Sequence, residues 1–127
     1  MNIDSLRAYC LSLPGATEGI QWDNDLLFRI AGKIFAVVSL EMSPNRFSFK
    51  CTPEEFAELT EREGIIPAPY MARNKWVTVE GFDILSRQET RRLIRDSYDM
   101  VLAKLPKKVQ AQFASPPAKP RSTSKSR

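Results

Sequence analysis

Residues 26–40 read LLFRIAGKIFAVVSL, and this stretch decides the fold. Two apolar runs, 26–30 and 34–40, stand on either side of a short turn that contains Gly32. Such a pair of runs around a glycine-containing turn is typical of a β-hairpin. The second run is apolar at both odd and even positions, as in a strand covered on at least part of both faces. We therefore expect residues 34–40 to form a central strand of an antiparallel sheet.

Two further strands are predicted downstream. Residues 46–51, RFSFKC, alternate strictly between polar and apolar side chains, as in a strand with one face in water. Residues 74–80 form the fourth strand, which Gly81 ends. The stretches 16–25 and 65–73 lack this alternation, the first being polar and the second rich in proline. We expect both of them to be irregular.

Helices are predicted on both sides of these strands. Apolar residues at helical spacing indicate helices over 3–13 and 87–105, and we expect residues 107–113 to add one further turn. Thr52 followed by Pro53 indicates the start of another helix, which we expect to end at Gly64. The order α-β-β-β-α-β-α describes an α+β two-layer sandwich, in which an antiparallel sheet carries its helices on one face.

Charge separates the chain into a neutral body and a basic end. Nineteen of the 127 residues are Lys or Arg and fifteen are Asp or Glu. Residues 114–127 hold four of the basic residues and no acid, so residues 1–113 hold fifteen of each kind. We expect a single domain over 1–113 and a disordered basic tail over 114–127, where Ser, Pro, Lys and Arg prevail.

The composition excludes several kinds of chemistry. The chain has no histidine, which excludes imidazole acid/base catalysis and Ser-His-Asp or Cys-His nucleophile systems. Its two cysteines, Cys10 and Cys51, cannot supply a four-ligand zinc site, and both lie at positions typical of buried apolar residues. We therefore expect no enzymatic activity, no cofactor and no metal.

The termini and hydropathy bear on location. The first residues lack the basic start and apolar core of a signal peptide. No apolar run approaches the roughly 20 residues of a membrane span. We expect a cytoplasmic monomer without a membrane partner.

Five short motifs follow one another along the chain. They are LPGATE (13–18) with Trp22, FRIAGKIF (28–35), FKC (49–51), PAPYMARNKWV (67–77) and SYDMVLAKLP (97–106). In this order they resemble the MmcQ/YjbR family, over about residues 3–110. The resemblance implies a fold similar to that of CyaY and frataxin, and an association with DNA. Many relatives carry a histidine directly before the tryptophan, where this chain has Lys75, so no role of that imidazole carries over.

The strand pattern also suggests a surface for nucleic acid. Alternation places Arg46 and Lys50 opposite the phenylalanines of their strand, and Trp76 opposite the valines of the next. On a face without helices, the cations would neutralise phosphates and the indole would stack on a base. DNA or RNA is therefore the expected partner. The candidate binding residues are Arg46, Lys50, Arg73, Lys75, Trp76, Lys107, Lys108, Lys119, Arg121, Lys125 and Arg127.

Alternatives remain open for this surface. The 65–73 loop can instead fold over Trp76 and form a small satellite core, because most large aromatic side chains are buried. A pocket between this loop and the sheet, lined by Tyr70, Arg73 and Trp76, would suit an adaptor that binds a protein or a small ligand. The basic tail can equally be a solubilising end without a partner.

Overall fold

The structure is a computed structural model that describes residues 1–21, 24–40, 45–69 and 71–113. Tyr70, Trp22 and the basic tail lie outside the described residues. In chain order the elements are α1 (Ile3–Ser12), β1 (Ala16–Gln21), β2 (Asp25–Ile30), β3 (Lys33–Ser39), β4 (Arg46–Lys50), α2 (Pro53–Leu59), β5 (Ile65–Pro67), the short 3-10 helix η1 (Ala72–Asn74), β6 (Trp76–Val79), α3 (Arg87–Ala103) and α4 (Lys107–Phe113).

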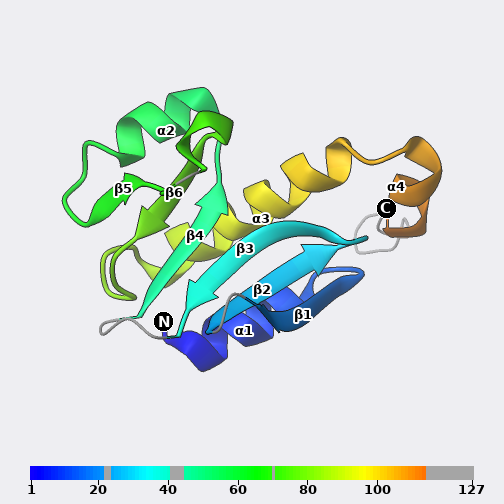
Figure 1. Ribbon diagram of the computed structural model, residues 1–127, viewed down its shortest axis with the longest axis horizontal. Coiled ribbons are helices and arrows are strands. Elements are labelled where there is room, and N and C mark those ends of the chain that lie inside the picture. The colour runs from blue at the N-terminus through cyan, green and yellow to red at the C-terminus, as the bar shows by residue number, and fades with distance from the viewer. Residues whose placement is uncertain (22–23, 41–44, 70, 114–127) are drawn as a thin grey trace.

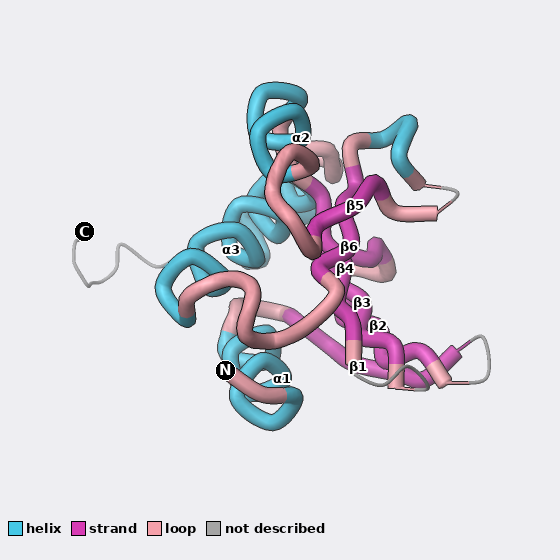
Figure 2. The backbone as a smooth tube through the Cα atoms, turned by 90° about the vertical axis from the view of Figure 1, so that its left-hand side faces the viewer, coloured by secondary structure: helices cyan, strands magenta, loops and turns pink. Residues whose placement is uncertain are grey.

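The strands form one antiparallel sheet in the order β1-β2-β3-β4-β6-β5 (Figure 1). Helix α3 packs against β3 and β4, α1 against β1, and α2 against β5 and β6. Figure 2 shows these three helices on one side of the sheet, while the segment with η1 extends on the other side. The predicted α+β architecture, with helices on one face of an antiparallel sheet, is confirmed.

Two strands correct the expectation that 16–25 and 65–73 are irregular. β1 and β5 occupy the two edges of the sheet. β1 pairs with β2 along its whole length, yet four of its six residues are exposed, so it lacks an alternating pattern. β5 has only three residues and ends at Pro67, as proline permits at a sheet edge. Helix α2 also differs, because it ends at Leu59 rather than at Gly64.

Side-chain caps account for where the helices begin. Asn2 Oδ1 accepts from Ser5 N at 2.8 Å, and Thr52 Oγ1 accepts from Glu55 N at 3.1 Å. Ser86 caps α3 through a reciprocal capping box with Glu89. Each such cap contributes about 1 kcal/mol by satisfying amide groups that have no partner within the helix.

The core lies between the sheet and the helices. Phe28, Phe47 and Phe49 from the sheet, together with Ile94 and Tyr98 from α3, are among its fully buried side chains. Burial of a side chain of this size stabilises the fold by about 1.5–3 kcal/mol. Their enclosure fixes α3 firmly against β3 and β4.

Both cysteines are buried, as predicted. Burial raises the pKa of the Cys10 thiol to about 12. It also raises the pKa of the Cys51 thiol to about 11, and the carboxylate of Glu55 acts in the same direction. Neither thiol is therefore ionised at neutral pH.

Candidate functional site

The pairing between β3 and β4 stops short of the first residues of β3 and of the last residue of β4. Their register runs from Ser39↔Arg46 to Ala36↔Phe49, although β3 begins at Lys33 and β4 continues to Lys50. An irregularity in the β2–β3 register bends this hairpin, whereas β4 stays paired with β6. Figure 1 shows the hairpin curving towards α4 while β4 runs towards α2. The sheet thus forks between β3 and β4.

A buried serine from α3 bridges the apex of this fork. Phe35 and Lys50 would form the next pair if the β3–β4 register continued. Instead, Ser97 Oγ donates to Phe35 O at 2.7 Å and accepts from Lys50 N at 2.9 Å. The hydroxyl therefore satisfies one backbone group on each strand, which matters because unpaired buried polar groups are costly. Ser97 also fixes where the backbone of Lys50 lies.

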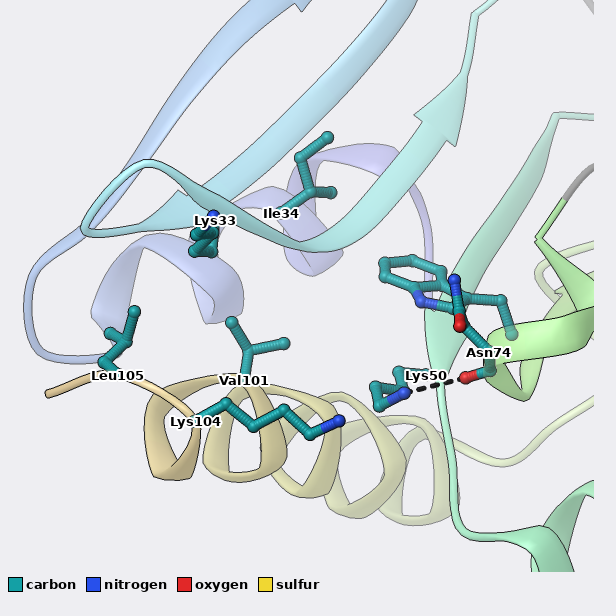
Figure 3. A pocket seen from close by; sticks show the side chains of 8 residues that line it. Lys33, Ile34, Lys50, Asn74, Val101, Lys104 and Leu105 are labelled. Atoms are coloured by element: carbon teal, nitrogen blue, oxygen red, sulfur yellow. Dashed lines mark hydrogen bonds between the residues drawn. The ribbon is translucent and has the colours of Figure 1, made fainter.

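Beyond this apex the strands border a pocket of about 490 Å³, which we call the fork pocket. Its lining comes from β3, β4, η1, β6 and α3, and from the two residues that follow α3. Figure 3 shows Val101 of α3 and the C-cap residue Lys104 across from Ile34 of β3. Val101 thus places a side chain of α3 in one wall of the pocket. The lining residues are Lys33, Ile34, Lys50, Asn74, Trp76, Val101, Lys104 and Leu105.

Three lysines and no acidic residue line the fork pocket. Among the described residues, no carboxylate forms a salt bridge with any of these lysines. Lys50 Nζ donates to Asn74 O at 2.7 Å, which holds its ammonium group at the pocket wall (Figure 3). Burial lowers the pKa of Lys50, and repulsion from Lys104 lowers it further. An anion beside these two groups would relieve that repulsion, so the pocket is chemically suited to an anion.

Trp76 contributes to the wall of the fork pocket rather than offering a free ring. Its side chain is only 5% exposed. Ala68 N donates to Trp76 O at 3.0 Å, and Trp76 N donates to Met71 O at 3.3 Å, so the preceding loop closes around this residue. This corrects the expectation that the indole is available to stack on a base. Trp76 also lies outside the main core cluster, in keeping with the satellite core that was the alternative.

The open face does not present two free cations, which corrects a second expectation. Arg46 stands at the other end of β4 from Lys50, where its guanidinium lies 3.1 Å from the carboxylate of Glu80. Lys75, in a left-handed conformation with φ 64°, places Nζ 5.0 Å from the centroid of the Phe56 ring. This cation–π contact directs Lys75 towards α2, so it is not among the pocket residues.

The remaining candidates lie around or beyond the pocket. Arg73 is exposed on η1 and does not line the fork pocket. Lys107 and Lys108 are exposed at the start of α4, which confirms the predicted extra turn. They follow Leu105 of the pocket within three residues. Outside the described residues lie Tyr70, Lys119, Arg121, Lys125 and Arg127.

The arginines of α3 do not form a second basic surface. Arg92 pairs with Asp96 at 3.1 Å and with Glu55 at 2.9 Å. Arg95 pairs with Asp99 at 3.2 Å. Charge on this helix is thus largely cancelled between neighbours.

Sequence reasoning missed Lys33, Lys104 and Ser97. The two lysines are separated by 71 positions and meet only because the strands fork, which no local pattern reports. Ser97 did carry a signal, because it stands three residues after Ile94 and directly before Tyr98 in the buried stripe of α3. A serine in such a stripe indicates a backbone group that needs a partner.

Two other kinds of site were considered. Within the described ranges, no cluster of three or more His, Cys, Asp or Glu side chains could hold a metal ion. In the same part of the chain, every helix is too short or too polar to cross a membrane.

Comparison with known proteins identifies relatives of this chain. No curated protein matches it. A Deinococcus radiodurans protein, DR2400, which carries a DUF419 domain, superposes with a TM-score of 0.81 at 27% identity, over 91% of this chain and 89% of that one. A Pseudomonas syringae protein from a structural genomics programme has the same fold, with a TM-score of 0.64 at 23% identity over 79% and 98% of the two chains. The YjbR family model matches residues 11–100, and the chain therefore belongs to the YjbR family.

Proposed function

We propose that this protein is a non-enzymatic, cytoplasmic monomer that binds DNA or RNA through the lysines in and beside the fork pocket. The observation that carries the proposal is the convergence of Lys33, Lys50 and Lys104 on one pocket that no acidic residue lines. Phosphates are the ligands that such unopposed ammonium groups attract, independently of base sequence.

Neighbouring charges extend this positive region. Lys107 and Lys108 are exposed on α4, which follows the pocket residue Leu105 directly. The basic tail begins after the end of α4 and carries four further cations without an acid. A strand that contacts the pocket would therefore meet additional cations on the C-terminal side. Because the indole is buried, we expect phosphate contacts rather than base stacking to supply the affinity.

The proposal is tested by fluorescence anisotropy with a labelled 20-nucleotide single strand at two salt concentrations. The full chain should bind at low salt, and Lys33→Gln/Lys104→Gln should weaken binding about tenfold. The double variant should also reduce the slope of log K against log salt by about 1.4, or about 0.7 for each lost phosphate contact.

Two controls locate the interface. Arg46→Gln should leave affinity within about twofold, because Glu80 already neutralises Arg46. Changing Lys119, Arg121, Lys125 and Arg127 to Gln measures the tail separately. If only the tail variant loses binding, or if the unaltered chain does not bind, the fork pocket is not a nucleic-acid interface.

The alternative of a ligand-binding adaptor keeps part of its basis. Trp76 lines a pocket as that reading expected, whereas Arg73 does not, and Tyr70 lies outside the described residues. A small anion that raises the melting temperature, without any binding of nucleic acid, would favour this second function.

A further inference from the structure

The fork pocket has protein on two of its sides. Val101 of α3 and the C-cap residue Lys104 contribute to one wall. Ser97 bridges the strands at the apex, so the fork ends in protein there as well. A pocket with walls on these two sides can receive the end of a chain or a small molecule.

The charges in the pocket match a doubly charged group better than a singly charged one. A phosphodiester carries one negative charge, whereas a phosphate monoester carries about 1.5 to 2 at neutral pH. Three lysines line the pocket, and among the described residues no carboxylate forms a salt bridge with any of them, so their positive charge is uncompensated. Lys50 is further held by its bond to Asn74 O, so it meets a ligand in a fixed position.

The rest of the lining suits what is attached to such a phosphate. Ile34, Val101 and Leu105 give the pocket an apolar part, and the largely buried Trp76 also lines it. A volume of about 490 Å³ falls within the range of pockets that hold small organic ligands. Inorganic phosphate alone would leave the apolar lining without a contact, whereas a sugar or base attached to the phosphate would cover it.

We propose that the fork pocket binds the terminal phosphate monoester of a nucleotide, either at the end of a nucleic-acid strand or on a free nucleoside monophosphate. The strand-end form rests on the proposed function, whereas the free form does not depend on it. Lys50 and Lys104 contact the phosphate oxygens from two sides, Lys33 closes the rim, and the apolar lining receives the nucleoside.

The experiment compares three oligonucleotides of identical sequence, with an internal fluorophore and a phosphate at the 5′ end, at the 3′ end or at neither. One phosphorylated form should bind the full chain about tenfold more tightly than the unphosphorylated strand, as for a charge-assisted contact of about 1.4 kcal/mol. Lys50→Met and Lys104→Met should each abolish this preference. Arg46→Met should keep it, since it removes a cation that Glu80 already neutralises.

A parallel arm uses adenosine monophosphate against adenosine in thermal-shift measurements. A rise in melting temperature with the monophosphate alone, lost in Lys104→Met, supports the free-nucleotide form even where no oligonucleotide binds. Lys104 is exposed at the C-cap of α3, so its replacement leaves the fold intact. Equal binding of all three strands together with no thermal shift would overturn the inference while leaving the proposed function standing. No binding in either arm would overturn both.

Discussion

The two ends of β4 carry a cation on the same face of the sheet, yet only one of them is free to bind an anion. At the first end, Arg46 lies opposite Ser39 in a closed β3–β4 ladder and pairs with Glu80. At the other end the ladder has opened, and Lys50 faces two further lysines across the fork pocket. Alternation therefore determines which side of the sheet a residue faces, whereas the neighbouring strands determine whether its charge is available.

The largest effect is expected on stability, from removing the serine hydroxyl that bridges β3 and β4 at the fork. Ser97→Ala removes the hydroxyl that serves Phe35 O and Lys50 N, and leaves a buried carbonyl and a part-buried amide without that partner. We expect the free energy of unfolding in urea to fall by about 2–6 kcal/mol, at about 1–3 kcal/mol for each of the two groups. Circular dichroism of the unfolding transition measures it.

Ser12→Ala is the matched control for this loss. Its hydroxyl donates to Tyr9 O at 2.6 Å on an exposed part of α1, so the same substitution there should cost less than about 0.5 kcal/mol. Equal losses of stability in the two variants would mean that the bridge from Ser97 to Phe35 O and Lys50 N does not stabilise the fork. If Ser97→Ala is fully stable but no longer prefers a terminal phosphate, β3 and β4 have paired directly across the fork.

A smaller effect is expected from removing the carboxylate that neutralises Arg46 at the first end of β4. Glu80→Gln should release the charge of Arg46 and strengthen single-strand binding about two- to threefold at low salt. The slope of log K against log salt should become steeper by about 0.7, the contribution of one added phosphate contact. Anisotropy titrations at several salt concentrations measure both.

Glu18→Gln tests whether this gain depends on place. It makes the same change in net charge, but its partner Arg7 lies on α1, on the helix side of the sheet. We expect little change in affinity from it. An equal gain in both variants would attribute the effect to net charge and remove the distinction between the two ends of β4.

The parts of the fold that depend on local sequence could be predicted. The hairpin around Gly32 and the capped start of α3 follow from patterns within a few residues, and the structure has both. The edge strands could not be found in this way. β1 is mostly exposed and β5 is three residues long, so neither produces the alternation that burial on one face imposes.

The site was predictable only where the alternation within single strands determines it. Lys50 and Trp76 could be assigned to one face from alternation, and they do line the same pocket. Lys33 and Lys104 required knowledge of the irregularity that bends the hairpin away from β4. The neutralisation of Arg46 required the β4–β6 register, which pairs Phe47 with Val79 and so brings the adjacent Glu80 beside Arg46.

The smallest effect concerns the stability cost of concentrating charge at the open end. The pKa of Lys50 is lower in the folded chain than in the unfolded chain, where its usual value is 10.5. The unfolded state therefore binds this proton more tightly, and the charge opposes folding at every pH below the folded pKa. As the pH rises through the folded pKa and past 10.5, this opposition disappears.

Lys50→Met removes that cost and with it the pH dependence. Relative to the variant, the unaltered chain should gain stability as the pH rises from 7 to 11, by less than about 0.5 kcal/mol because water screens a partly exposed ammonium group. Urea titrations over this pH range measure the difference, with Lys107→Met as the control for loss of an exposed lysine. If the stability of the unaltered chain relative to the variant stays constant or falls as the pH rises, the fold does not lower the pKa of Lys50. The electrostatic contrast between the two ends of β4 would then lie in the missing carboxylate alone, and not in repulsion within the fork pocket.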